Sequence, residues 1–302
     1  MTALHSVLLL SLLAADPLGP GDHTRTLMVG ELERSYVVHV PPKYDHENST
    51  PVVLIYHGGG SNAEVMVRFS GMNQKLDEAG FIAVYPNGTG LLPRTLTFNG
   101  GNCCGYAMRQ NVDDVEFTRR LLDDLATVVN GDRKRAFATG MSNGGIITYR
   151  LASELSDRIA AIAPVCGPMG TEACDPKRPV PVMHFHGTDD ENAPFKGGKG
   201  KGVSGTDFYS VEHSIQAWVK ANGCNEEPIV TKQQPKVNDG TTIIRTTYGG
   251  GKDGSEVVLI EIVGGGHTWP GGPSRVRFLG KTTMNISAND AMWEFFQKHP
   301  MK

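Results

Sequence analysis

The chain has 302 residues, 39% of them hydrophobic, and a formal net charge of −3 at pH 7. This length allows one large domain with a substantial core. The near-neutral charge argues against nucleic acid as a partner, and no apolar run is long enough to span a membrane, so neither partner is predicted.

The N-terminus resembles an export signal. An apolar run, Val7–Ala15, is followed by a linker rich in proline and glycine, Asp16–Gly21. No lysine or arginine precedes the run and the cleavage site is weak, so a mis-assigned start codon is an alternative explanation. We expect residues 1–24 to be a signal peptide and linker, residues 25–302 to form a single domain, and the protein to be secreted or periplasmic.

Downstream, apolar patterns predict strands and helices that alternate along the chain. Strands are predicted at 35–40, 52–56, 81–85, 159–165, 180–186, 242–248 and 256–263. Helices are predicted at 63–79, 113–128, 208–219 and 289–298. This alternation indicates βαβ units, so we predict an α/β fold in which helices cover both faces of a mainly parallel sheet.

The most informative stretch is a predicted strand, turn and helix around Gly140-Met-Ser-Asn-Gly144. A sharp Gly-x-Ser-x-Gly turn in that context exposes the serine hydroxyl, and glycines flank Ser142 because side chains there would collide. The following helix directs its first N–H groups toward a developing oxyanion. The motif also occurs by chance, with the serine as a helix cap, so the rest of the site decides between these interpretations.

Two later strand ends supply the partners that a catalytic serine needs. His267 lies on a glycine-rich loop after one strand, and Asp190 follows the strand predicted at 180–186. Loops at the carboxyl ends of parallel strands converge on one edge of the sheet. We therefore predict Ser142 as nucleophile, His267 as general base and Asp190 as the acid that orients it, with Asp189 and Glu191 as competitors for the last role.

A fourth feature, His57-Gly-Gly-Gly60, follows the strand predicted at 52–56. In α/β-hydrolases this position supplies the second oxyanion donor, and glycines let the backbone approach the substrate closely. We expect the backbone N–H groups of Gly59 and Asn143 to form the oxyanion hole, with His57 anchoring the loop. The four features in this order make a chance serine motif improbable.

Other residues support weaker hypotheses. Met141, Tyr106 and Trp269 are candidates for the wall of a substrate pocket, although Trp269 is equally well explained as packing its own loop. His184 and His186 share one face of a strand, which could suit a metal ion, but we expect them to be core and loop-anchoring residues. No metal or cofactor is predicted.

The five cysteines lack the paired spacing of a zinc site. We expect two disulfides drawn from Cys103, Cys104, Cys174 and Cys224, with Cys166 unpaired. The connectivity does not follow from the sequence. Five buried thiols in a reduced cytosolic enzyme are the alternative.

Together these motifs resemble those of the polyhydroxybutyrate depolymerase-like esterases, a group that overlaps the feruloyl and acetylxylan esterases of carbohydrate esterase family 1. The motifs are His57-Gly-Gly-Gly60, Asn102-Cys-Cys-Gly105, Val112-Asp-Asp-Val115, Gly140-Met-Ser-Asn-Gly-Gly145, Ala163-Pro-Val165, His186-Gly-Thr-Asp-Asp190 and Gly266-His-Thr-Trp-Pro-Gly271. The resemblance extends from about Arg34 to Pro300. It implies a secreted, single-domain α/β-hydrolase that cleaves carboxylic esters without a cofactor, and it supports the triad proposed above.

We therefore expect a serine carboxylic-ester hydrolase that works through an acyl-enzyme on short-acyl, hydroxyacid-oligomer or feruloyl-polysaccharide esters. The ester is the expected partner, and the protein is expected to be a monomer. An acyltransferase that uses the same triad is one alternative. A non-catalytic binding member of the fold is another, although such proteins usually lose the serine or histidine.

Overall fold

The computed structural model describes residues 16–202, 204–272 and 276–302, so the apolar segment expected to be a signal peptide lies outside the described residues. The strands are β1 (Gly21–Val29), β2 (Leu32–Val40), β3 (Thr50–Tyr56), β4 (Ile82–Pro86), β5 (Gly131–Met141), β6 (Ile162–Val165), β7 (Val182–Gly187), β8 (Gly198–Lys199), β9 (Asp207–Phe208), β10 (Ile229–Lys232), β11 (Thr242–Tyr248) and β12 (Val257–Val263). The helices are α1 (Ala63–Ser70), α2 (Met72–Ala79), α3 (Gly105–Arg109), α4 (Asp114–Leu125), α5 (Asn143–Glu154), α6 (Val211–Asn222) and α7 (Ala288–Lys298), with short 3₁₀ turns at Lys252–Gly254 and Arg277–Leu279.

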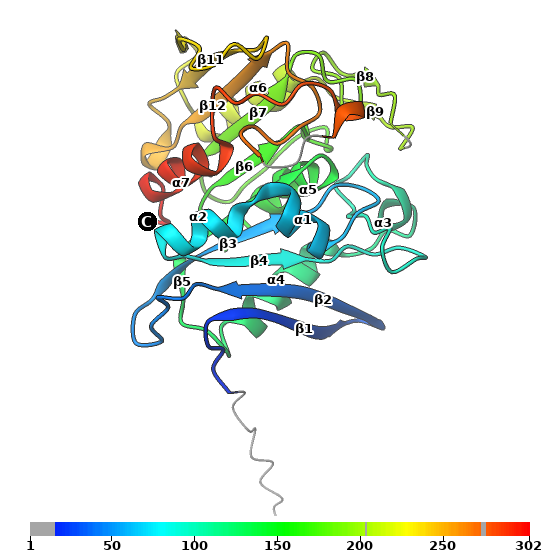
Figure 1. Ribbon diagram of the computed structural model, residues 1–302, viewed down its shortest axis with the longest axis vertical. Helices are drawn as coiled ribbons and strands as arrows, with labels where there is room; N and C mark the ends of the chain where they lie inside the picture. Colours follow the sequence, from blue (N-terminus) through cyan, green and yellow to red (C-terminus); the bar gives the residue numbers. More distant parts are fainter. Residues whose placement is uncertain (1–15, 203, 273–275) are drawn as a thin grey trace, which may run out of the picture.

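Ten of the described strands form one twisted sheet through the middle of the molecule (Figure 1). Their order is β1-β2-β4-β3-β5-β6-β7-β12-β11-β10. The strands from β4 to β12 in this order run parallel, whereas β1, β2, β11 and β10 add antiparallel pairs at the two edges. The predicted α/β fold with a mainly parallel sheet is confirmed.

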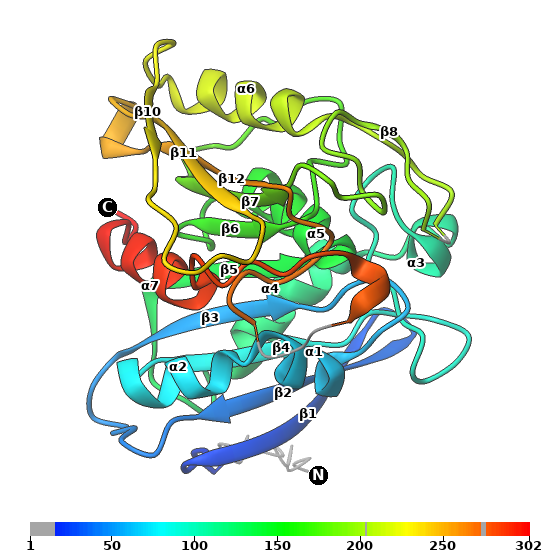
Figure 2. The ribbon, with the colours of Figure 1, turned by 45° about the horizontal axis from the view of Figure 1, so that its top comes forward.

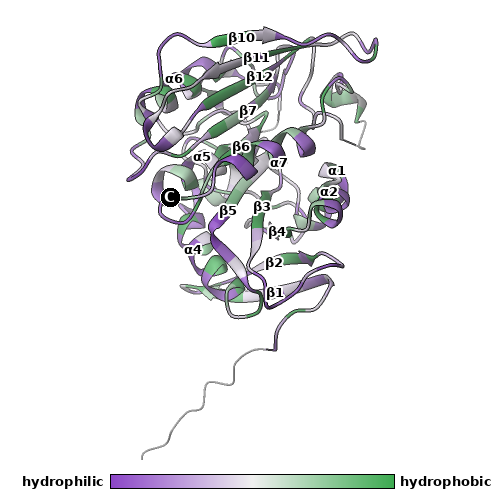
Figure 3. Ribbon diagram, turned by 90° about the vertical axis from the view of Figure 1, so that its left-hand side faces the viewer, coloured by the Kyte–Doolittle hydropathy of each residue, from purple (hydrophilic) through white to green (hydrophobic). Residues whose placement is uncertain are grey.

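Helices cover both faces of this sheet (Figure 2). Helices α4, α5 and α6 pack on one face, and α1, α2 and α7 pack on the other. Strand β3 shows why the central strands read as continuous apolar runs. Leu54 and Tyr56 point into the first helical layer while Val53 and Ile55 point into the second, and all four are buried. The hydrophobic colour of Figure 3 accordingly follows the central strands.

Strand register brings the chemically important loops to one edge of the sheet. Tyr56 on β3 pairs with Gly140 on β5, and Met141 pairs with Val165 on β6. Val165 is in turn the partner of Phe185 on β7. The residues that follow these strand ends therefore emerge side by side, as parallel strands require.

The structure departs from the predicted elements at several places, including the short unpredicted elements α3, β8 and β9. β1 begins at Gly21, so the last part of the expected linker is a strand. The single helix predicted at 63–79 is broken at Gly71, whose φ of 60° is left-handed, into α1 and α2. β10 was not predicted, because all four of its residues are exposed and carry no buried pattern.

The cysteines also differ from expectation. Cys103 is paired with Cys104 across a cis peptide bond, whereas Cys166, Cys174 and Cys224 are free thiols. The two expected disulfides are therefore not shown, and Cys166 is unpaired as expected.

No helix within the described ranges combines the length and apolar character needed to cross a bilayer.

Candidate active site

Ser142 occupies the sharp turn between β5 and α5. Its backbone has φ 57° and ψ −119°, a conformation that costs a non-glycine residue about 1–3 kcal/mol. Hydrogen bonds on both sides of the residue hold it there, because its N–H donates to Val165 O at 2.8 Å and its carbonyl accepts from Ile146 N at 2.9 Å. The side chain is partly exposed at the first turn of the helix. The turn thus exposes the Ser142 hydroxyl at the carboxyl ends of the parallel strands.

The flanking glycines are required by close backbone contact. A Cβ at Gly144 would collide with the carbonyl of Tyr56, and one at Gly140 would collide with the backbone of Gly144 itself. A Cβ at Gly167, in the loop after β6, would likewise collide with the carbonyl of Ser142. The helix, the turn and the neighbouring strands therefore approach more closely than any larger residue allows.

His267 and Asp190 are brought together by two adjoining loops. The loop after β7 and the loop after β12 are joined by the N–H of Asp189 donating to Gly265 O at 2.9 Å and that of Gly264 donating to Thr188 Oγ1 at 2.9 Å. His267 Nδ1 lies 2.6 Å from Asp190 Oδ2. Since a carboxylate only accepts, Nδ1 carries the proton, which leaves Nε2 free to act as a base.

The two competing carboxylates lie elsewhere. Asp189 is exposed and accepts a hydrogen bond from Thr188 Oγ1. Glu191 is paired with Lys201 Nζ at 2.6 Å in an exposed ion pair. Among the three candidates, Asp190 is the one that the structure places against His267.

The Asp190 carboxylate is fully surrounded by donors. Oδ1 accepts from the N–H groups of Asn192 and Ala193, both at 2.9 Å. Oδ2 accepts from His267, and His186 Nε2 lies 3.3 Å from the same oxygen. Burial alone would raise the pKa of Asp190, but the hydrogen bonds from His186 and His267 outweigh it and hold the pKa well below its usual range. The group is therefore ionised at neutral pH.

The expected oxyanion loop lies directly against the serine turn. An ideal Cβ on Gly58 would be 3.7 Å from Ser142 Cβ, and one on Gly59 would be 3.6 Å from Asn143 Cβ. Within the described residues, the backbone N–H groups of Gly59 and Asn143 make no hydrogen bond to protein, whereas that of Gly60 is used by Leu96 O at 2.9 Å. The two predicted donors are thus adjacent and free.

The Asn143 side chain has a separate role that the sequence did not reveal. Its Oδ1 accepts from Phe98 N at 2.7 Å and its Nδ2 donates to Phe98 O at 2.9 Å. This pair of bonds fixes the loop that contains Cys103 and Cys104 against the start of α5. Nothing in the local sequence pattern distinguishes this amide from a solvent-exposed one.

His57 is buried beneath the oxyanion loop. Its Nε2 accepts a hydrogen bond from Gly88 N at 3.0 Å, and Nδ1 lies 2.8 Å from Gly58 O, so the neutral ring ties the loop to the end of β4. Burial is the main reason that the pKa of His57 is lowered to about 4.

We expect this histidine to make the fold sensitive to mild acid. The unfolded chain takes up a proton at His57 near pH 6.5, whereas the folded chain does so only near the lower pKa, so the free energy of unfolding falls across that window. His57 alone should lower it by about 2 kcal/mol between about pH 7.5 and about pH 5. Urea unfolding followed by circular dichroism measures the change.

The matched variant for this prediction is His57→Gln, which can accept from Gly88 N–H but does not titrate. Between about pH 7.5 and about pH 5, the free energy of unfolding of His57→Gln should fall by about 2 kcal/mol less than that of the unmodified protein. Buried His184, whose pKa burial also lowers, contributes in the same direction in both proteins. Equal acid sensitivity of the two proteins would contradict the assignment.

Cys166 follows β6 and lies beside the His267–Asp190 pair. Its Sγ and one ligand atom from each of these two residues all lie within 4.8 Å of one another, and all three residues are buried. Such a set could in principle hold a metal ion, but the 2.6 Å bond between His267 and Asp190 leaves no room for an ion between them. Burial, with the charge of Asp190, raises the pKa of Cys166 well above its usual value, so the thiol stays protonated.

The predicted pocket residues fare differently. Trp269 is 1% exposed, donates from Nε1 to Asn289 Oδ1 at 2.8 Å and packs in the core beneath α7, which favours the packing interpretation over the pocket wall. Met141 is 4% exposed in the same core, which favours packing over a pocket wall for it as well. Tyr106 is partly exposed on α3 and stays a candidate.

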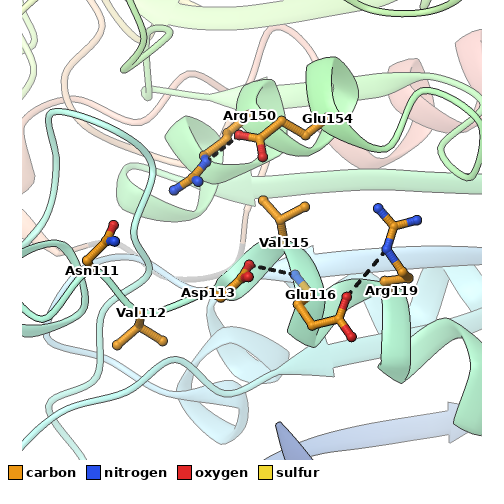
Figure 4. Close-up of a pocket in the computed structure, with 8 residues that line it drawn as sticks. All are labelled: Asn111, Val112, Asp113, Val115, Glu116, Arg119, Arg150 and Glu154. Carbon is orange, nitrogen blue, oxygen red and sulfur yellow. Dashed lines mark hydrogen bonds and ion pairs between the residues drawn. The ribbon is translucent and has the colours of Figure 1, made fainter. Parts of the chain in front are cut away.

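A pocket of about 320 Å³ lies away from this site, between the start of α4 and the outer face of α5 (Figure 4). Its lining is mostly polar and includes Asp113, Glu116, Arg119, Arg150 and Glu154, but not Ser142, Asp190 or His267. Arg150 and Glu154 pair with each other across one helical turn at 2.6 Å. The pocket is therefore not the place where this triad would meet a substrate.

The sheet order, the serine turn and the acid and histidine loops define the class of protein as an α/β-hydrolase. The fold agrees with that of an acetyl xylan esterase from Aspergillus awamori, which superposes with a TM-score of 0.54 at 14% identity, over 91% of this chain and 99% of that one.

The chain belongs to the dienelactone hydrolase family, which matches residues 37–218. It is 30% identical over 288 residues to a protein of Nocardia uniformis named "Putative esterase NocK", covering 90% of this chain and 81% of that one. It is also 30% identical over 242 residues to feruloyl esterase B of Piromyces equi, covering 78% of this chain but only 42% of that enzyme. The chain is a carboxylic ester hydrolase. The feruloyl and acetylxylan esterase part of the resemblance is confirmed, whereas these relatives give no support to its polyhydroxybutyrate part.

Proposed function

We propose that the protein hydrolyses carboxylic esters through an acyl-enzyme formed on Ser142. The observation that carries the proposal is the Nδ1 to Oδ2 bond of 2.6 Å between His267 and Asp190, next to a strained serine turn. This bond leaves His267 Nε2 as a base in the tautomer that serine catalysis needs.

In the first half-reaction, Ser142 Oγ attacks the ester carbonyl carbon while His267 Nε2 takes the hydroxyl proton. The carbonyl π electrons move to oxygen, and the N–H groups of Gly59 and Asn143 stabilise that oxyanion. Collapse of the tetrahedral intermediate breaks the bond to the alcohol oxygen, which takes the proton from His267. Asp190 stays ionised throughout and stabilises the imidazolium.

In the second half-reaction, water replaces the alcohol. The water oxygen attacks the acyl carbon while His267 takes a proton from the water. The carboxylic acid leaves when His267 returns that proton to Ser142 Oγ. No cofactor or metal takes part in either half. An alcohol or sugar in place of water would give acyl transfer by the same steps.

A fluorophosphonate ester tests the nucleophile directly. Oγ of Ser142 should form a bond to phosphorus, fluoride should leave, and the proton should pass to His267. Peptide mass spectrometry is expected to find one adduct, on the peptide that contains Ser142, and the adduct should form in step with loss of activity. Labelling of another serine, or full activity after labelling, would contradict the mechanism.

For the substrate, we propose acetyl or feruloyl esters on plant polysaccharide, because the named relatives include feruloyl esterases and the fold matches an acetyl xylan esterase. Rates on methyl ferulate, acetylated xylan and hydroxybutyrate oligomers compare the candidate acyl groups. Faster turnover of the hydroxybutyrate oligomers would overturn this choice. Adding an acceptor alcohol would show whether transfer competes with water.

We also propose that the enzyme is exported, on the strength of its apolar N-terminal segment, Val7–Ala15. N-terminal sequencing of the protein recovered outside the cytoplasm tests this. The expected result is a mature chain that begins before β1.

A further inference from the structure

A buried chain of hydrogen bonds leads from the middle of α5 to the carboxylate of Asp190. Tyr149 Oη lies 2.9 Å from His184 Nδ1, and His184 Nε2 lies 2.9 Å from His186 Nδ1. His186 Nε2 lies 2.7 Å from Ala193 O and 3.3 Å from Asp190 Oδ2. Tyr149, His184 and His186 are each 0% exposed. Bulk solvent therefore does not reach these three side chains.

The direction of every bond follows from its two ends. A carbonyl only accepts, so His186 Nε2 carries a proton that it donates to Ala193 O at 2.7 Å, and the same N–H lies beside Asp190 Oδ2 at 3.3 Å. The Nδ1 of a neutral His186 is then an acceptor, which requires a proton on His184 Nε2. His184 Nδ1 is in turn an acceptor, and the Tyr149 hydroxyl donates to it. All donors in the chain thus point toward Asp190.

We propose that His186 is a positioning residue for Asp190, held in its Nε2–H tautomer by Tyr149 and His184 so that the carboxylate is fixed by a second histidine. This inference rests on the proposed role of Asp190 in orienting His267. Three hydrogen bonds reach the carboxylate, from Asn192 N, Ala193 N and His267, and His186 Nε2 adds a fourth N–H at 3.3 Å from Oδ2. With two N–H groups near each oxygen, the lone pairs of the carboxylate are all engaged. Rotation of the carboxylate would therefore break at least one of these contacts.

Two consequences follow for the reaction. Rotation of Oδ2 away from the charged imidazole would also break its contact with His186 Nε2, so His186 opposes that rotation. The second donor also lowers the proton affinity of the carboxylate, in keeping with the depressed pKa of Asp190, so the proton taken from Ser142 stays on His267. Loss of His186 should slow catalysis without changing the binding of the ester.

The kinetic test compares His186→Leu, which has no donor, with His186→Gln, which can place an amide N–H near the former Nε2. Since a hydrogen bond to a charged group is lost, His186→Leu should lower kcat about 10- to 100-fold, with KM within about twofold. His186→Gln should recover most of that loss. Tyr85→Phe, which removes a buried hydroxyl bonded to Asn73 away from the triad, should keep kcat within about twofold.

Equal losses in His186→Leu and His186→Gln at equal thermal stability would overturn the positioning role, because packing alone would then explain them. A change in KM with unchanged kcat would overturn it as well. Circular dichroism melting of all variants separates these outcomes from unfolding.

The second measurement is independent of activity. Long-range ¹H–¹⁵N spectra of histidine-labelled enzyme at about pH 7.5 should show the Nε2–H tautomer for His184 and His186, and the Nδ1–H tautomer for His267. A cationic His186, or Nδ1–H on His184 or His186, would overturn the chain. Because this readout needs no substrate, it can fail while Ser142 labelling succeeds, and the reverse, so the inference and the proposed function are tested separately.

Discussion

Replacing Ser142 with alanine is expected to lower kcat for a p-nitrophenyl ester roughly a million-fold, because no other group can form the acyl-enzyme. The His267–Asp190 pair would stay in place with no hydroxyl to deprotonate. Residual turnover above the rate in water would come from the oxyanion donors and from substrate binding. Steady-state assays of the purified proteins, with long incubations for the variant, measure the difference in kcat.

The control is Ser153→Ala on the same helix, α5. Ser153 Oγ accepts from Asp175 N at 2.9 Å, away from the triad, so this variant should keep its activity within about twofold. Ser142→Ala should also fold, because alanine can occupy the same strained backbone conformation at similar cost. If the Ser142→Ala enzyme were active and had a normal melting curve, Ser142 would not be the nucleophile.

The parts of the fold that the sequence predicts are those in which the local pattern and the tertiary burial agree. Strand β3, buried on both faces, reads as an uninterrupted apolar run, and α7 shows its apolar spacing clearly. β1 and β10 lie at opposite edges of the sheet, where exposure removes the pattern. Gly71 divides a continuous helical pattern because its left-handed conformation is not encoded in apolar spacing.

The site follows the same division. The positions of Ser142, His267 and the acidic loop are predictable because parallel strands deliver their carboxyl ends to one edge. The sequence favours Asp190 but leaves Asp189 and Glu191 as competitors, because the choice depends on which side chain a tight turn directs inward. The sequence also showed that His184 and His186 share a face, but only the structure reveals that a tyrosine and a carboxylate occupy the two ends of that face.

Replacing Asp190 with asparagine is expected to lower kcat about ten-thousand-fold while the loop keeps its shape. Four donors converge on the carboxylate, whereas an amide offers only one acceptor oxygen. If that oxygen accepts from the N–H groups of Asn192 and Ala193, the amide NH₂ faces His267 Nδ1. The imidazole must then become an acceptor at Nδ1 and carry its proton on Nε2, where it cannot deprotonate Ser142.

Asp189→Asn provides the matched control, since it makes the same chemical change on the adjacent, exposed residue and should leave kcat within about twofold. Steady-state assays of both variants, with ¹H–¹⁵N spectra of His267, connect the rate to the tautomer. The slow variant should show Nε2–H in place of Nδ1–H. A fast Asp190→Asn enzyme, or a slow one whose His267 keeps its Nδ1 proton, would show that orienting the base is not what this carboxylate does.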